Sequence, residues 1–119
     1  MRRKSKKTAA IERRMKPIRE NYLLGHPLCH VCSRPTSDCH EIVRGSDRWK
    51  AYQHPGAWLS LCRACHDLMD DYSIWPPARQ VALKMLADPQ TYSLEMIQDL
   101  RGDHLVMLED VVQYLELKQ

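Results

Sequence analysis

Four of the five cysteines form two Cys-x-x-Cys pairs, Cys29 with Cys32 and Cys62 with Cys65. Such a turn places two thiolates on one face of a metal ion, and zinc prefers four ligands in a tetrahedron. The matching spacing argues against unrelated core cysteines, and neither pair has the strand–helix context of a redox dithiol. We therefore predict one closed, structural zinc site formed by all four thiolates.

Two histidines stand next to this framework in the chain. His40 lies between the pairs, in the segment Asp-Cys-His-Glu-Ile-Val at residues 38–43, and His66 directly follows the last cysteine. In isolation, His40 would be interpreted as an ordinary hairpin histidine, and His66 as a helix residue bonded to a backbone carbonyl. Beside a zinc framework, both become candidates for a second metal site.

The fifth cysteine and the histidine inside the first pair receive structural interpretations. Cys39 is most simply a small buried residue on the hairpin, and a fifth metal ligand is the alternative. His30 stands between the first two thiolates. We expect it to point away from the ion and to lie at the surface.

The order Cys-x-x-Cys, a His-containing strand and then Cys-x-x-Cys-His resembles the zinc-stapled HNH endonucleases (ββα-metal fold), including small ones encoded by phages. The resemblance covers about residues 20–72. It implies a catalytic divalent ion between the hairpin strand and the helix. By position, His40 matches the strand ligand, Ile42 the following aliphatic residue and His66 the closing ligand, while Glu41 stands where the family's general-base His is usual.

The resemblance implies hydrolysis of DNA phosphodiester bonds with one divalent metal, Mg²⁺ or Mn²⁺, that stabilises the leaving oxygen. Glu41 would activate the attacking water as a general base. Arg44, Arg48 and Lys50, in the loop after the first strand, would bind phosphates.

The sequence departs from the family pattern at two positions and leaves other functions open. Glu41 replaces the base His, and the family's central Asn falls near Ala57. An alternative alignment makes Cys39 the ligand and His40 the base. The rival functions are a nucleic-acid-binding or regulatory protein that kept the fold without hydrolysis, and an adaptor whose helical tail docks on a larger complex.

Charge is distributed unevenly along the chain. Residues 1–19 contain nine basic side chains and one acidic one, while the other hundred residues contain nine basic and fourteen acidic ones. A cationic arm on an acidic body is typical of a polyphosphate partner, so DNA is the expected partner, although a solubilising tail or a localisation signal has the same composition. The expected DNA-binding residues of the arm are Arg2, Arg3, Lys4, Lys6, Lys7, Arg13 and Arg14.

The elements that must position these residues follow from hydrophobic periodicity and helix-ending residues. We predict a helix from Thr8 to about Leu24 with a kink or break at Pro17, strands over 39–43 and 58–61, and a helix from Cys62 to near Tyr72. Helices over 79–87 and 94–100, and an apolar stripe through 108–115, complete the chain.

These elements predict a mostly helical α+β fold with a small zinc-bound treble-clef (ββα-metal) core. We expect a basic arm and helix start at 1–19, the core at 20–75, and a helical tail at 76–119 that packs on the core and could bind a protein partner. Trp58 should be buried, and Trp49 is the candidate for stacking on bases. With no apolar run of membrane-spanning length and no secretory signal, we expect a cytoplasmic protein, in a bacterial host if phage-encoded, with reduced cysteines.

Overall fold

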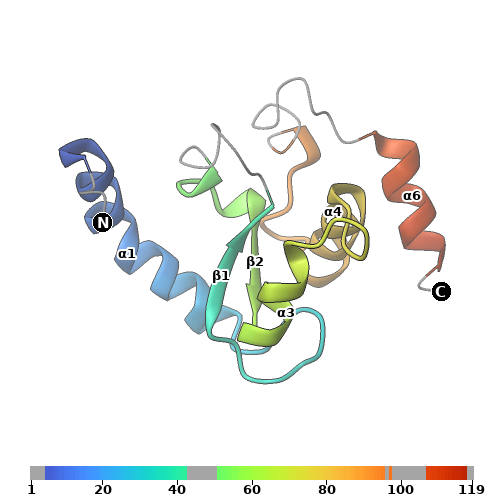
Figure 1. Cartoon of the computed structure of the whole chain (residues 1–119), viewed down its shortest axis with the longest axis horizontal. Coiled ribbons are helices and arrows are strands. Elements are labelled where there is room, and N and C mark those ends of the chain that lie inside the picture. The colour runs from blue at the N-terminus through green and yellow to red at the C-terminus, as the bar shows by residue number, and fades with distance from the viewer. Residues whose placement is uncertain (1–4, 43–50, 96, 98–106, 118–119) are drawn as a thin grey trace.

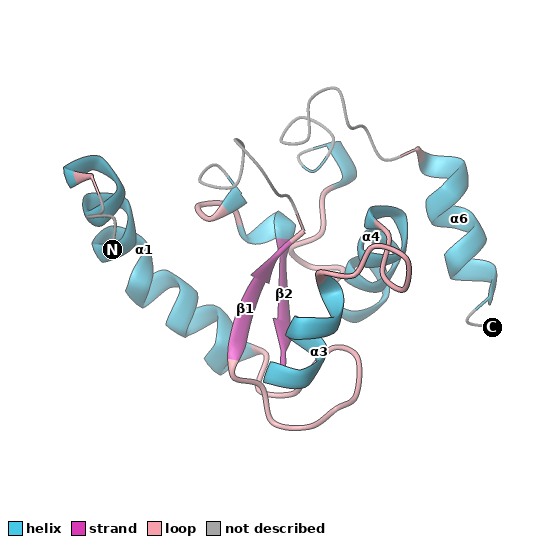
Figure 2. Cartoon of the chain, in the orientation of Figure 1, coloured by secondary structure: helices cyan, strands magenta, loops and turns pink. Residues whose placement is uncertain are grey.

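A computed structural model of the chain describes residues 5–42, 51–95, 97 and 107–117 (Figure 1). The fold is α+β and mostly helical, as predicted (Figure 2). In chain order the elements are α1 (Lys6–Gly25), β1 (Asp38–Glu41), the short 3₁₀ helix η2 (Pro55–Ala57), β2 (Trp58–Leu61), α3 (Arg63–Met69), α4 (Pro77–Ala87) and α6 (Leu108–Leu117).

The two strands form an antiparallel hairpin that separates two groups of helices. His40 pairs with Leu59 and Glu41 pairs with Trp58. Helix α1 lies on one side of the hairpin, and α3 and α4 lie on the other (Figure 1). Because successive side chains of a strand point to opposite faces, Asp38 and His40 share the face toward α3 and α4. Glu41 therefore faces α1.

Each face of the hairpin has its own apolar cluster. Toward α1, Met15 and Tyr22 pack against Trp58, which is fully buried as predicted. Toward α3 and α4, Leu59 belongs to a larger cluster that includes Val111 of α6. The C-terminal helices therefore pack on the same core as the cysteines.

Helix α1 is longer and more regular than predicted. It begins at Lys6, where Ser5 Oγ accepts a hydrogen bond from the backbone N–H of Thr8 at 3.1 Å, and it continues through Pro17. Proline removes one intrahelical hydrogen bond. Here, Met15 and Tyr22 pack on the same Trp58 on either side of the proline, so tertiary contacts hold the two halves of the helix together.

A buried polar network ties α1 to α4. Lys84 has no exposed surface, and its Nζ lies 2.6 Å from Asp88 Oδ2 and 3.1 Å from Tyr22 Oη. It also donates to Thr91 Oγ1 and to the backbone carbonyl of Pro55. The charged pair is therefore fully supplied with partners, as burial requires.

Several element boundaries differ from those predicted. β1 begins one residue earlier, at Asp38, because its pairing with β2 starts at Leu61; α3 is confined to Arg63–Met69 and α4 starts at Pro77. In the segment predicted as a helix over 94–100, residues 94, 95 and 97 are described and are helical.

Eight residues that the sequence analysis singled out lie outside the described residues: Arg2, Arg3, Lys4, Val43, Arg44, Arg48, Trp49 and Lys50. Within the described part of the chain, no helix is both long and apolar enough to cross a membrane.

Candidate metal centre and the adjoining histidine pair

The first cysteine pair lies in a tight turn closed by backbone hydrogen bonds. The N–H of Cys29 donates to the carbonyl of Arg34 at 2.7 Å, and the N–H of Ser33 donates to the carbonyl of Cys29 at 3.0 Å. Ser33 has a φ of 64°, in the left-handed region that favours glycine. This residue follows Cys32 directly and helps to close the turn.

Replacing Ser33 is expected to test this turn. Ser33→Gly should leave zinc content unchanged and should raise stability by up to about 1 kcal/mol, because a non-glycine residue in the left-handed region costs roughly 1–2 kcal/mol and added chain entropy offsets part of the gain. Ser33→Val should lower stability, because a β-branched residue is strained there. Urea unfolding of the zinc-loaded variants measures both, and a more stable valine than glycine variant would contradict the geometry.

The second pair is positioned by the junction of β2 and α3. Cys62 is the N-cap residue of α3, and Cys65 lies in its first turn, where the N–H of His66 donates to the Cys62 carbonyl at 2.9 Å. Because helical side chains three residues apart share a face, Cys62 and Cys65 point in one direction.

The first turn docks on β2 through His30, which sequence reasoning wrongly placed at the surface. The His30 N–H donates to the carbonyl of Ser60 at 2.8 Å, and His30 Nδ1 accepts from the Ser60 N–H at 3.1 Å. Burial lowers the pKa of His30 to about 4, so the ring is neutral and can accept. His30 thus uses the outer edge of β2 to fix the turn against the hairpin.

The two pairs bring four sulfur atoms together. One ligand atom from each of Cys29, Cys32, Cys62 and Cys65 lies within 4.8 Å of all the others, and the Sγ atoms of Cys32 and Cys62 are 3.6 Å apart. Among the described residues, this is the only group of three or more His, Cys, Asp or Glu side chains that meets this distance. A four-sulfur set of this kind suits a metal such as zinc.

The environment of the sulfurs also favours thiolate formation at one position. Burial alone would raise the pKa of Cys29, but backbone N–H groups, including those of Cys32 and Cys62, outweigh it and lower the pKa to about 7. Burial raises the pKa of Cys65, and so do the hydrogen bonds that its S–H donates to the neighbouring sulfurs. Four thiols crowded together resist sharing negative charge, and a bound cation relieves that repulsion.

The structure also brings the rings of His40 and His66 close together. Their ring centroids are 5.1 Å apart, with the planes at 71°. His40 is 5% exposed, whereas the side chain of His66 is 27% exposed. The pair therefore lies at the boundary between the core and solvent, and His66 directly follows Cys65 in the chain.

Each of these rings has a polar partner that sequence reasoning missed. His66 Nδ1 lies 2.8 Å from Asp38 Oδ2, and Arg63 donates to the same oxygen at 3.0 Å. Burial would raise the pKa of Asp38, but the hydrogen bonds from His66 and Arg63 lower it, so the carboxylate is ionised. His40 Nε2 lies 2.8 Å from Oε1 of Gln80, which comes from α4. The alternation of β1 could have identified Asp38, but nothing local in the sequence marks Gln80.

The structure does not bring Glu41 to the two histidines. Glu41 lies on the opposite face of β1, where its Oε1 is 3.4 Å from the guanidinium of Arg19. Arg19 also donates to the carbonyl of Cys39 at 2.8 Å and stacks on the ring of Tyr52. The carboxylate therefore faces α1 and not the two rings, because neighbouring strand residues point to opposite sides, and the role of Glu41 as a base stays a prediction.

Cys39 shares the α1 face with Glu41 and packs against Met15, Tyr22 and Trp58. Burial raises the pKa of its thiol to about 12. Cys39 is thus a partly buried thiol, which agrees with its interpretation as a packing residue on the hairpin.

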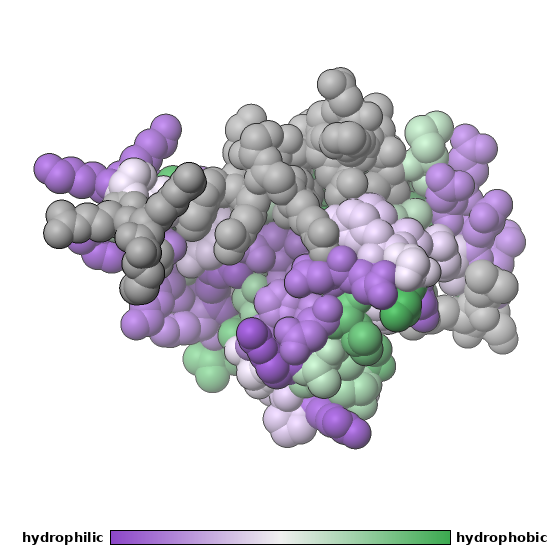
Figure 3. Space-filling model, viewed as in Figure 1, coloured by the Kyte–Doolittle hydropathy of each residue, from purple (hydrophilic) through white to green (hydrophobic). Residues whose placement is uncertain are grey.

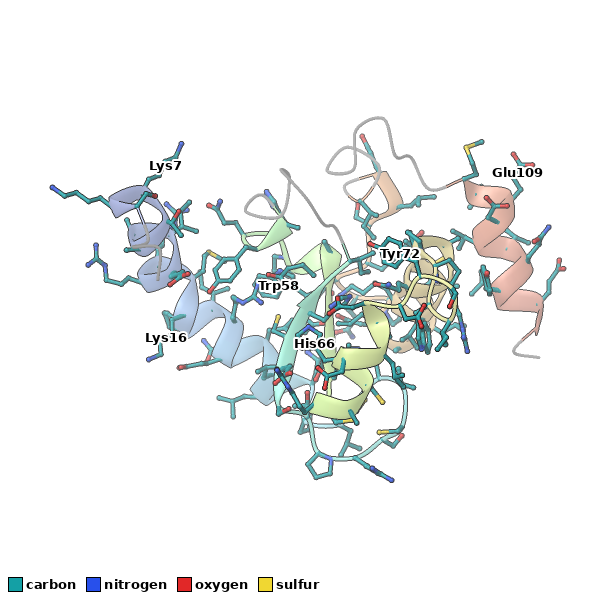
Figure 4. All side chains as sticks on the ribbon, in the orientation of Figure 1. Lys7, Lys16, Trp58, His66, Tyr72 and Glu109 are labelled. Carbon is teal, nitrogen blue, oxygen red and sulfur yellow. The ribbon has the colours of Figure 1, made fainter. Side chains whose placement is uncertain are left out.

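The basic side chains of the arm that the structure describes lie along α1. Lys6, Lys7, Arg13 and Lys16 are exposed, while Arg14 donates to Oε1 of Gln53. Figure 4 shows Lys7 and Lys16 pointing away from the body of the protein, and Figure 3 shows hydrophilic surface over this end of the molecule. The helix therefore presents these cations to solvent.

Comparison with protein-family models, with curated proteins and with solved structures gave no match.

Proposed function

We propose that this chain is an HNH-like endonuclease that hydrolyses DNA phosphodiester bonds, with one structural zinc and one catalytic divalent cation. The single observation that carries the proposal is the meeting of His40 and His66 beside the four-cysteine cluster, with ring centroids 5.1 Å apart. The order of these residues along the chain and their position on one strand and one helix are those of the family that the sequence resembles.

In this proposal zinc is a structural ion that holds two parts of the fold together. The four sulfurs join the turn at 29–32 to the start of α3, so an ion between them would fix the helix against the hairpin. His66 follows Cys65 directly, and His40 lies on the strand paired with β2. The zinc ion would therefore set the distance between the two imidazoles.

His40 and His66 would hold the catalytic ion, with Asp38 supporting His66. A divalent cation at this position supplies charge stabilisation for the scissile phosphate and the leaving oxygen. Two imidazole donors suit transition metals better than Mg²⁺, so we expect Mn²⁺ to support activity more strongly than Mg²⁺. Glu41 is not the base in this proposal, because it faces α1 and pairs with Arg19.

The proposed activity is tested by nicking of supercoiled plasmid in Mn²⁺ or Mg²⁺. We expect His40→Ala and His66→Ala to lower the rate at least about 100-fold, because each removes an interaction made with the reacting phosphate through the ion. Glu41→Gln is the matched control on the opposite face and should stay within about 10-fold of the unsubstituted protein.

Two results would overturn parts of this proposal. Equal losses of nicking rate in Glu41→Gln and His40→Ala would support Glu41 as the general base. No cutting under any metal, with zinc content and fold intact, would favour the second candidate below.

The second candidate is a zinc-bound nucleic-acid-binding or regulatory protein without hydrolysis. The observation that favours it is that the three expected catalytic side chains all have protein partners: His40 bonds to Gln80, His66 to Asp38 and Glu41 to Arg19. Such partners are also what orients metal-binding histidines in active enzymes. The plasmid assay separates the two functions.

DNA binding through α1 has its own expected result. Replacing the exposed residues Lys6, Lys7, Arg13 and Lys16 with Gln should weaken duplex binding and reduce the salt slope, log Kd against log salt, by about 0.9 for each phosphate that the variant no longer neutralises. This variant is preferable to deleting residues 1–19, which would also remove Met15 and Arg19 from their packed positions.

Fluorescence anisotropy with a labelled duplex, at several salt concentrations, measures the slope. Arg34→Gln, an exposed change on the first cysteine turn, is the control and should leave the slope unchanged. An unaltered slope in the four-residue variant would contradict a role for α1 in DNA binding. Weak, salt-insensitive affinity in the unsubstituted protein would favour an adaptor that binds a protein through its C-terminal helices.

A further inference from the structure

Gln80 connects the helical tail to the histidine pair. It lies on α4, outside the segment that resembles the nuclease family, and it is 1% exposed. Its Nε2 donates to the backbone carbonyls of Met69 at 3.1 Å and Trp75 at 2.9 Å. Its Oε1 lies 2.8 Å from Nε2 of His40.

The orientation of the Gln80 amide is fixed by its neighbours. An amide NH₂ group has two hydrogens to donate, and two carbonyl oxygens accept them here. If the amide were reversed, Oε1 would face both carbonyl oxygens without a proton between them, which is costly in a buried site. Oε1 is therefore the atom that faces His40.

This orientation determines the tautomer of His40. An amide oxygen only accepts hydrogen bonds, so His40 Nε2 must carry the hydrogen of the 2.8 Å contact. A neutral imidazole has one N–H, and the lone pair is then on Nδ1. Only the nitrogen with the lone pair can bind a metal ion.

Asp38 performs the corresponding function for His66. Oδ2 of Asp38 already accepts a hydrogen bond from Arg63 at 3.0 Å, so His66 Nδ1 is the donor of the 2.8 Å contact to the same oxygen, and the lone pair is on Nε2. In each ring one nitrogen donates to a protein acceptor, and the lone pair is on the other nitrogen.

We propose that Gln80 is a positioning residue of the His40–His66 site, which holds His40 as its Nε2–H tautomer and makes Nδ1 the nitrogen that binds a divalent cation. The cation-binding part rests on the proposed function, whereas the tautomer stands independently of it. Helix α4 is then a component of the site. Hydrogen bonds of this kind to metal-binding histidines commonly change metal affinity or activity by about 10–100-fold when they are removed.

The first test reads the tautomer directly in the unsubstituted protein. Zinc-loaded protein labelled with ¹⁵N-histidine, without other divalent ions and at a pH that keeps the rings neutral, gives long-range ¹H–¹⁵N spectra of the six histidines. The His40 signals are identified by their loss in His40→Gln. A protonated Nε2 and an unprotonated Nδ1 are expected. A protonated Nδ1 would overturn the proposal, and this result needs no Gln80 variant to fold.

The second test compares Gln80→Leu with Gln90→Leu, an exposed glutamine just beyond α4. In Gln80→Leu the His40 ring N–H should exchange with water at least about 10-fold faster and Mn²⁺ affinity should fall by about 10–100-fold, with zinc content retained. Gln90→Leu should change neither quantity. If Gln80→Leu keeps both the slow exchange and the Mn²⁺ affinity, the assigned role is wrong.

The two proposals fail in different ways. A protein that never cuts DNA, but shows the expected tautomer and loses Mn²⁺ affinity in Gln80→Leu, refutes the nuclease and keeps the role of Gln80. A protein that cuts DNA with His40 in the Nδ1–H form keeps the nuclease and refutes the role of Gln80.

Discussion

Removing zinc is expected to unfold the centre of the chain. The four sulfurs join the turn at 29–32 to the start of α3, across the hairpin, so the binding free energy of the ion is folding free energy. Structural zinc sites contribute about 10–16 kcal/mol by this route, whereas a whole domain of this size is stable by about 5–15 kcal/mol. Loss of the ion therefore costs an amount comparable to the whole stability of such a domain. Circular dichroism during titration with a strong chelator should show loss of helix and strand signal, restored by one equivalent of zinc.

Two cysteine variants test whether the four-cysteine cluster is the zinc site on which folding depends. Cys62→Ser should lose zinc and fold poorly, because it removes a ligand at the start of α3. Cys39→Ala should keep one zinc per chain, because Cys39 packs on the α1 face of the hairpin. Equal zinc loss in both variants would show that the four-cysteine cluster is not the structural zinc site. An unchanged circular dichroism spectrum in the chelated protein would show the same.

Breaking the buried ion pair is the second change with a large expected effect. Lys84→Met should destabilise the protein by about 3–5 kcal/mol, because it leaves the Asp88 carboxylate buried without its closest cation, which lies at 2.6 Å. Replacing both residues, as Lys84→Met with Asp88→Leu, should recover part of the loss. Lys16→Met, on the exposed face of α1, is the control and should change stability by less than about 0.5 kcal/mol.

The same pair predicts a dependence on pH. Burial would raise the pKa of Asp88, but hydrogen bonds from Lys84, Thr91 and Tyr22 outweigh it and hold the pKa below its usual value; His26 also faces the carboxylate, at 3.2 Å. A carboxyl group with a lowered folded-state pKa contributes stability above its unfolded pKa, about 3.9, and loses it as the pH falls further. Urea unfolding between pH 7 and pH 3 should show this loss in the unsubstituted protein and a smaller one in Asp88→Asn. Parallel curves for the two proteins would contradict it.

Local patterns in the sequence were sufficient for much of the fold. The second strand was predicted over 58–61, which are its bounds in the structure, because a short apolar run precedes Cys62. The meeting of the four cysteines in a group that could hold a metal ion was predicted from spacing alone, since Cys-x-x-Cys geometry is a property of a single turn. The helix ending at Ala87 followed from the proline that comes soon after it.

The missed features depend on contacts between distant residues. Which face of β1 holds Glu41 follows from where α1 packs, and Arg19, its ion-pair partner, is 22 positions earlier in the chain. Gln80 reaches His40 across 40 positions of sequence. The burial of Lys84 was not predicted, because two of its partners come from α1 and from the segment before β2. Periodicity along one element carries no information about such pairings.

The geometry also changes how the resemblance to HNH nucleases is interpreted. The expected base, Glu41, lies on the α1 face, whereas Asp38, which was not among the predicted site residues, bonds to His66 on the other face. The site that we propose therefore consists of His40 and His66, oriented by Gln80 and Asp38. It occupies the face of the hairpin between α3 and α4.

The most direct test of this site is anomalous X-ray scattering at the manganese edge from zinc-loaded crystals soaked in Mn²⁺. The proposal predicts a manganese peak about 2.0–2.4 Å from both His40 Nδ1 and His66 Nε2, separate from a zinc peak among the four sulfurs. Anomalous density confined to the sulfurs, with no ion shared by the two imidazoles, would contradict the account.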